Sequence, residues 1–128
     1  MTVPSEREEL LANAIVKSAY AVHRALGPGL LESIYETCFC HELKKRGIPH
    51  RRQVVVPLTY DGVTLSQGLR LDILVDDSIV CELKSVEALT PVFLAQILSQ
   101  LKLSDKHLGF LINFNVAVIK EGIRRVIL

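Results

Sequence analysis

The sequence has no tryptophan, and only three tyrosines and four phenylalanines among 128 residues. Proteins that stack single-stranded bases need exposed aromatic side chains, so this scarcity argues against a binding protein of that kind. Long apolar runs are absent too: none approaches the roughly 20 residues that span a bilayer. The first seven residues lack the charged-then-apolar layout of a signal peptide. We therefore expect a cytoplasmic protein with no membrane partner.

A zinc-binding pattern is also missing. The three cysteines, Cys38, Cys40 and Cys81, are odd in number and lie inside apolar segments. Zinc ligands usually occur as closely spaced pairs joined by further Cys or His residues. We expect reduced structural thiols, and no organic cofactor.

The chain is predicted to form one compact domain over residues 1–128, because 49% of it is apolar and 23% charged. Ser5 followed by Glu8 predicts a capped helix that ends at Gly27-Pro28-Gly29. Further helices are predicted over about 30–46 and 91–104, and strands over 53–60, 67–75, 78–85, 107–114 and 123–128. The order α-α-β-β-β-α-β-β predicts an α+β fold, an α/β sandwich around a mixed sheet.

Three acidic residues lie in otherwise apolar patterns: Glu32, Asp72 and Glu82. A buried charge needs a partner, and two carboxylates ~4 Å apart repel by about 4 kcal/mol at an effective dielectric of ~20. A divalent cation or an ammonium group reverses the sign of that energy. Lys84 shares a strand face with Glu82. The spacing alone therefore fits two interpretations, a metal site or an ion pair of Lys84 with one of the acids.

The strand register decides whether Asp72 and Glu82 lie on one face, and a longer loop or a bulge could also pair them. Residues 72 and 82 are symmetric about Asp77, so a three-residue turn over 76–78 places Asp72 opposite Glu82. A two-residue turn would instead pair Asp72 with Cys81 and put Glu82 on the other face.

Several segments resemble a known family. Gly29, Glu32 and Tyr35, with His23 in the approach, match the segment that names the G-x-x-E-x-x-Y proteins. Leu71-Asp72 followed by Glu82-Leu83-Lys84 resembles the D…E-x-K core of PD-(D/E)XK nucleases, and 109–114 resembles a later strand of that core. The resemblance runs from about residue 23 to the C-terminus.

This resemblance implies a PD-(D/E)XK nuclease-like core, a central mixed β-sheet flanked by helices. It implies that Mg²⁺, with Mn²⁺ as an alternative, is held by Glu32, Asp72, Glu82 and the backbone carbonyl of Leu83. Lys84 would then orient the attacking water. Gln96 matches the first residue of a related Q-x-x-x-Y motif, and Gln100 stands where that motif has tyrosine.

The implied function is metal-dependent hydrolysis of phosphodiester bonds in DNA, and less readily in RNA. The alternative is a module with the nuclease fold that binds nucleic acid or a protein without turnover. A homodimer whose second subunit completes the substrate channel is a further alternative.

Nucleic-acid binding is predicted for a few polar residues. The segment 44–52 holds five Lys/Arg and one His, of which Arg51 and Arg52 are candidates to contact phosphates. Cations at a helix C-terminus are stabilising without any ligand, and this interpretation fits equally well. Arg70 shares the face of Asp72 by parity, and it would contact a phosphate or pair with an acid. Gln100 is a further candidate on the third helix.

Overall fold

A five-stranded mixed sheet forms the centre of the fold in the computed structural model, which describes residues 3–128. The spatial order of the strands follows the chain: β1 (His50–Tyr60), β2 (Val63–Val75), β3 (Ile79–Lys84), β4 (Leu108–Asn113) and β5 (Ile123–Ile127). β3 and β4 pair in parallel, and the other neighbours pair antiparallel. A parallel pair needs a crossover connection, which α3 (Pro91–Leu103) supplies.

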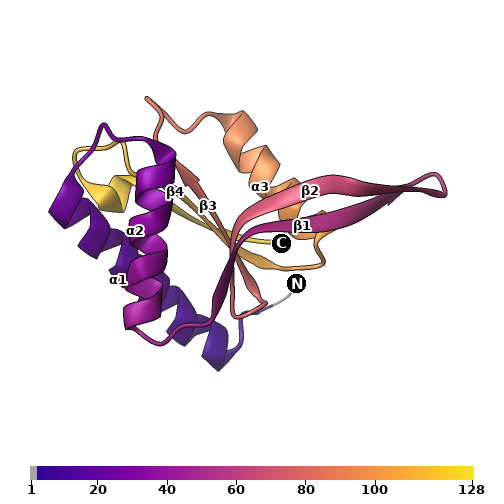
Figure 1. The fold of residues 1–128 in the computed structure, drawn as a ribbon, viewed down its shortest axis with the longest axis horizontal. Helices are drawn as coiled ribbons and strands as arrows, with labels where there is room; N and C mark the ends of the chain where they lie inside the picture. The colour runs from indigo at the N-terminus through magenta and orange to yellow at the C-terminus, as the bar shows by residue number, and fades with distance from the viewer. Residues whose placement is uncertain (1–2) are drawn as a thin grey trace.

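Helices cover both faces of this sheet, which confirms the predicted α+β sandwich with helices flanking a mixed sheet. α1 (Glu6–Leu26) and α2 (Glu32–Lys45) lie on one face and α3 on the other (Figure 1). Side chains of β3 alternate between the two faces as predicted. Cys81 and Leu83 belong to the large cluster under α1 and α2, whereas Val80 packs with Leu101 of α3.

The helix signals in the sequence are confirmed. Ser5 and Glu8 form the reciprocal capping box at the start of α1. Pro91 begins α3, where the missing N–H costs no hydrogen bond. A short 3₁₀ helix, η1 (Ile119–Gly122), precedes β5 and was not predicted. None of the described helices is both long and apolar enough to cross a membrane.

The first two strands are longer than predicted: β1 begins at His50 instead of residue 53, and β2 at Val63 instead of residue 67. Asp61 and Gly62 both have positive φ, and the tight turn they form lets pairing continue directly from Tyr60 to Val63. Arg51 and Arg52 consequently lie in a strand and not in a loop. The two strands project well beyond the helices (Figure 1). Their residues 54–69 are called the arm below.

The cysteines are free thiols, in agreement with the prediction. Burial raises the pKa of Cys40 to about 11 and that of Cys81 further. Both thiols are therefore protonated at neutral pH and act as small apolar core residues.

Candidate active site

Asp72 and Glu82 meet on the α3 face of the sheet. The turn between β2 and β3 has three residues, because Val75 pairs with Ile79, and the register continues to Ile73 opposite Cys81. The next position in this register brings Asp72 opposite Glu82, as the three-residue turn predicts. Beyond the last backbone pair, the Leu83 N–H donates to Oδ2 of Asp72 at 3.0 Å. The carboxylate of Asp72 therefore faces Glu82 and also holds the backbone of β3 next to it, through the Leu83 N–H.

Glu82 is a buried carboxyl group, with 8% of its surface exposed. Burial raises its pKa to about 8, the neighbouring Asp72 raises it too, and Gln100 and Lys84 act in the opposite direction. Its Oε2 atom is buried and has no hydrogen-bond partner among residues 3–128. Such an orphaned acceptor is costly unless something else satisfies it.

A hollow of about 490 Å³ opens beside these acids, between β3, α3 and the base of the arm. The ammonium group of Lys84 lies 4.9 Å from the ring centroid of Phe93, which holds it toward α3. Oε1 of Gln100 is buried without a partner among the described residues. The hollow is lined by Leu69, Glu82, Lys84, Val92, Ala95, Gln96, Ser99 and Gln100. Lys84, Gln96 and Gln100 therefore line the same hollow as Glu82, and their roles as site residues remain a prediction.

Glu32 lies close to this site but not in it. As the first residue of α2, it accepts a hydrogen bond from the N–H of Ser85 at 3.2 Å, just beyond the end of β3. It lines a separate hollow of about 350 Å³ with Leu30, Leu31, Ser33 and Ser85. Nowhere in residues 3–128 do three or more His, Cys, Asp or Glu side chains gather closely enough to hold a metal ion. The role of Glu32 as a metal ligand remains a prediction.

The structure gives a physical reason for the spacing of Gly29, Glu32 and Tyr35. The buried Tyr35 hydroxyl donates to the Gly27 carbonyl and accepts from the Leu30 N–H at 3.1 Å. Gly29 has φ of +95°, a conformation that favours glycine. The loop before α2 is thereby bound to a side chain of that helix. This contact fixes the point at which α2 begins, and with it the position of Glu32.

Two positioning residues, Ser85 and Asn113, were missed in the sequence. The Ser85 hydroxyl donates to the Leu30 carbonyl at 2.6 Å, so it joins the loop before α2 to the end of β3. Asn113 is buried at the end of β4, where its amide donates to the Val86 carbonyl at 2.9 Å and accepts from the Val86 N–H at 3.0 Å. Asn113 could have been found in the sequence, because it is a polar residue inside the otherwise apolar run 108–114. Both residues fix the chain where it leaves β3, directly after Lys84.

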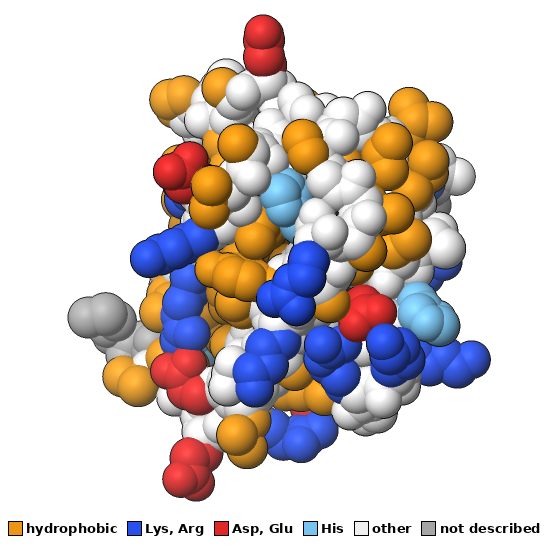
Figure 2. Space-filling view, turned by 90° about the vertical axis from the view of Figure 1, so that its left-hand side faces the viewer, with side chains coloured by type: hydrophobic (Ala, Val, Ile, Leu, Met, Phe, Trp, Pro, Cys, Tyr) orange, Lys and Arg blue, Asp and Glu red, His pale blue; other side chains and the backbone are white. Residues whose placement is uncertain are grey.

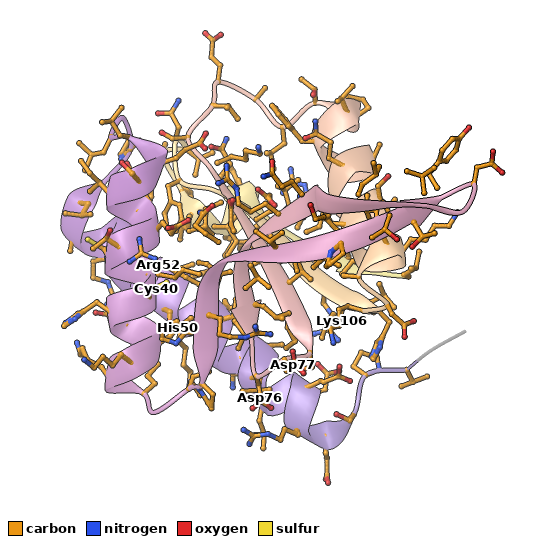
Figure 3. The ribbon with its side chains drawn as sticks, turned by 45° about the vertical axis from the view of Figure 1, so that its right-hand side comes forward. Cys40, His50, Arg52, Asp76, Asp77 and Lys106 are labelled. Carbon is orange, nitrogen blue, oxygen red and sulfur yellow. The ribbon has the colours of Figure 1, made fainter. Side chains whose placement is uncertain are left out.

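None of the predicted nucleic-acid-binding arginines lines the hollow beside Glu82. Arg51 pairs with Asp77 at 3.1 Å and Arg52 with Glu36 at 2.8 Å. Arg52 lies next to Cys40 of α2, and Asp77 lies at the β2–β3 turn (Figure 3). Arg70 has no ion-pair partner within the described part of the chain, and it lines another hollow of about 520 Å³ with Val55, Gln67 and Leu69.

Other cations lie on the opposite side of the sheet from the acids. Lys and Arg side chains gather on the face that α1 and α2 form (Figure 2). Glu82 and Lys84 line the hollow beside α3. The net charge of +1 does not show where the cations lie, and only the basic segment 44–52 pointed to a local concentration of them.

Comparison with known proteins agrees with this arrangement. A search of curated proteins and a search of solved structures find no significant match. The family model of the PD-(D/E)XK nuclease superfamily matches residues 9–126, which is nearly the whole chain. The match is at the level of the superfamily, while the finer G-x-x-E-x-x-Y assignment remains a resemblance. The chain belongs to the PD-(D/E)XK nuclease superfamily.

Proposed function

We propose that this protein is a divalent-metal-dependent nuclease that hydrolyses phosphodiester bonds in DNA. One observation carries the proposal: the buried Glu82 has an unpartnered Oε2, faces Asp72, and shares a hollow with Lys84. Superfamily membership supports the same chemistry. RNA is the less favoured substrate.

The donor atoms fit Mg²⁺, which takes oxygen ligands, often one or two carboxylates with several waters. Asp72, Glu82 and the carbonyl of Leu83 would hold the ion, and Glu32 would join them only by giving up its hydrogen bond with the Ser85 N–H. The proximity of Asp72 helps to raise the pKa of Glu82, and a cation would relieve this repulsion. When bound, Mg²⁺ or Mn²⁺ polarises the phosphate and lowers the pKa of a water.

The protein's own groups do the remaining work. The Lys84 ammonium would orient the attacking water and stabilise negative charge that develops on the phosphate. Gln96 and Gln100 offer amide N–H donors to phosphate oxygens from the α3 side. Leu69 and Val92 line the hollow with apolar surface.

DNA would follow the cations nearest the hollow. Arg70, which has no acid partner, is the first candidate to bind a phosphate. Arg51 and Arg52 are weaker candidates, because each must exchange a carboxylate for the phosphate. Their contribution would fall with rising salt.

The proposal is tested by incubating the purified protein with linear, circular and single-stranded DNA and with RNA, in Mg²⁺ or Mn²⁺. Lys84→Ala should reduce cleavage by about 100-fold or more while leaving the fold and most metal binding intact. Lys102→Ala removes an exposed lysine from the end of α3, outside the hollow, and should leave cleavage unchanged. Equal activity of the two variants would contradict the role of Lys84.

The second candidate is a binding module without turnover, and Gln100 favours it. This glutamine stands where related nucleases have the tyrosine of their Q-x-x-x-Y motif. If wild type cuts none of the four substrates and binds no metal at millimolar concentration, this candidate replaces the nuclease.

A further inference from the structure

The outer half of the arm has one apolar face and one polar face. Tyr60 pairs with Val63 and Leu58 with Leu65, so these four side chains lie on the same face of the two-stranded ribbon. The pair between them, Thr59 with Thr64, points to the opposite face. Tyr60 is 75% exposed, Val63 58% and Leu65 46%. The apolar face therefore meets solvent.

Nearer the body of the protein, across a register shift between Val56 and Leu58, apolar side chains of the arm are already covered. Val54, Val56 and Leu69 pack against a cluster that includes Leu71 and Leu101 of α3. α3 covers only this inner part, and the outer arm projects past it (Figure 1). Exposed apolar side chains that lie together, as Tyr60, Val63 and Leu65 do, mark an interaction site.

The charge of the arm identifies the kind of partner. Between Arg52 and Arg70 the sequence has one charged residue, Asp61. Affinity for a phosphate backbone depends on Lys and Arg, which the arm lacks. A two-fold contact brings a surface against its own copy, so a surface almost without charge can associate with itself without repulsion.

A standard interface uses about 20–30 residues on each side, more than the outer arm alone offers. The adjacent α3 exposes the apolar side chains Val92, Leu98 and Leu103, which would extend the contact.

We propose that the protein forms a two-fold homodimer through the apolar face of the outer arm, with Tyr60, Val63 and Leu65 at its centre. This dimer does not depend on whether the site hydrolyses phosphodiesters. Leu69 at the base of the arm lines the hollow beside Glu82, so a second copy on the arm would border the substrate cleft.

Sedimentation equilibrium of the full chain at about 50 µM, a concentration at which a dimer with a micromolar Kd is largely assembled, tests the proposal. Wild type should have twice the 14.3 kDa mass of one chain. Val63→Glu places a charge on the apolar face and should weaken the dimer at least tenfold, and Leu65→Glu should do the same. Thr64→Glu adds the same charge at the neighbouring position on the polar face, and it should remain dimeric. Circular dichroism checks that each variant is folded.

A monomeric wild type overturns the proposal, as does a dimer that Val63→Glu and Thr64→Glu weaken equally. A gel-shift assay with duplex DNA tests whether the arm binds nucleic acid instead of a second copy of the chain. If wild type is monomeric and Val63→Glu alone weakens DNA binding, the arm contacts nucleic acid and not a second copy.

Discussion

The two faces of the sheet differ in what they bury. Under α1 and α2 lies a large, almost wholly apolar cluster, in which Tyr35 stacks on Phe114 with ring centroids 4.6 Å apart. Under α3 the buried cluster is small, and beside it lie Asp72 and Glu82 with an orphaned carboxylate oxygen.

This difference separates stability from function. Burial of apolar surface on the α1 and α2 face stabilises the fold. The burial of Glu82 beside Asp72 on the α3 face costs stability, and the rest of the fold must offset that cost. Substitutions on the first face should therefore change the free energy of unfolding, and those on the second should change ligand binding.

Phe114→Ala should have the largest effect on stability. The ring is fully buried against Tyr35, so its loss should lower the free energy of unfolding by about 3–5 kcal/mol in urea denaturation. Leu98→Ala removes a partly exposed side chain from α3 and should cost about 1 kcal/mol or less. Similar losses in the two variants would contradict the proposed division between the faces.

The pH dependence of stability should reveal Glu82. Its pKa is raised from 4.5 to about 8 in the fold, so between these values the folded protein holds a proton that the unfolded chain has released. In metal-free protein, the free energy of unfolding should fall by roughly 2–4 kcal/mol as pH rises through this window.

Glu82→Gln should remove most of that pH dependence, and Glu87→Gln, an exposed glutamate after β3, should keep it. Urea denaturation of the three proteins at pH 5, 6.5 and 8 makes the comparison. Parallel curves for wild type and Glu82→Gln would show that Glu82 titrates normally.

Tyr35→Phe tests a polar contact on the α1 and α2 face. The substitution keeps the aromatic ring in the apolar cluster and removes only the hydroxyl. The Gly27 carbonyl and the Leu30 N–H lose their partner, which should cost about 1–3 kcal/mol in thermal or urea unfolding. Tyr20→Phe is the control, since no hydrogen bond of the Tyr20 hydroxyl occurs within the described residues and Tyr20 is half-buried. Equal stability of the two variants would mean that the hydroxyl does not bind the loop.

Arg51→Ala should have the smallest effect. Its ion pair with Asp77 joins two side chains that are 62% and 74% exposed, so its loss should change the free energy of unfolding by less than about 1 kcal/mol. A decrease in the free energy of unfolding of more than about 1 kcal/mol, measured in urea at moderate salt, would contradict this view of the pair as a weak surface ion pair.

The sequence predicted the local features of the fold and the pairing of two site residues. Period-2 alternation placed Glu82 with Lys84, and the symmetry of 72 and 82 about Asp77 predicted their register, which Val75 opposite Ile79 confirms. Both follow from geometry within one hairpin. The full length of the arm was missed, although the alternating Val63, Thr64, Leu65 and Ser66 fit a strand, because the expected strand was begun only after them.

Long-range contacts were beyond the reach of pattern reasoning. The bond between Ser85 and the Leu30 carbonyl joins residues 55 positions apart, and nothing in either local sequence indicates it. The same limit applies to Glu32, which the family resemblance placed among the metal ligands. The structure binds it to Ser85 at the end of β3, beside a different hollow.

The central claim, a metal site on the α3 face, is tested most directly by calorimetric titration of Mg²⁺ and Mn²⁺ into three proteins. Wild type should bind an ion at millimolar concentration or below, and Asp77→Asn, a change at an exposed acid in the β2–β3 turn, should bind it equally well. Asp72→Asn should lose at least about tenfold in affinity, because it removes a carboxylate ligand. Equal binding by Asp72→Asn and wild type, or no binding by wild type, would contradict the account.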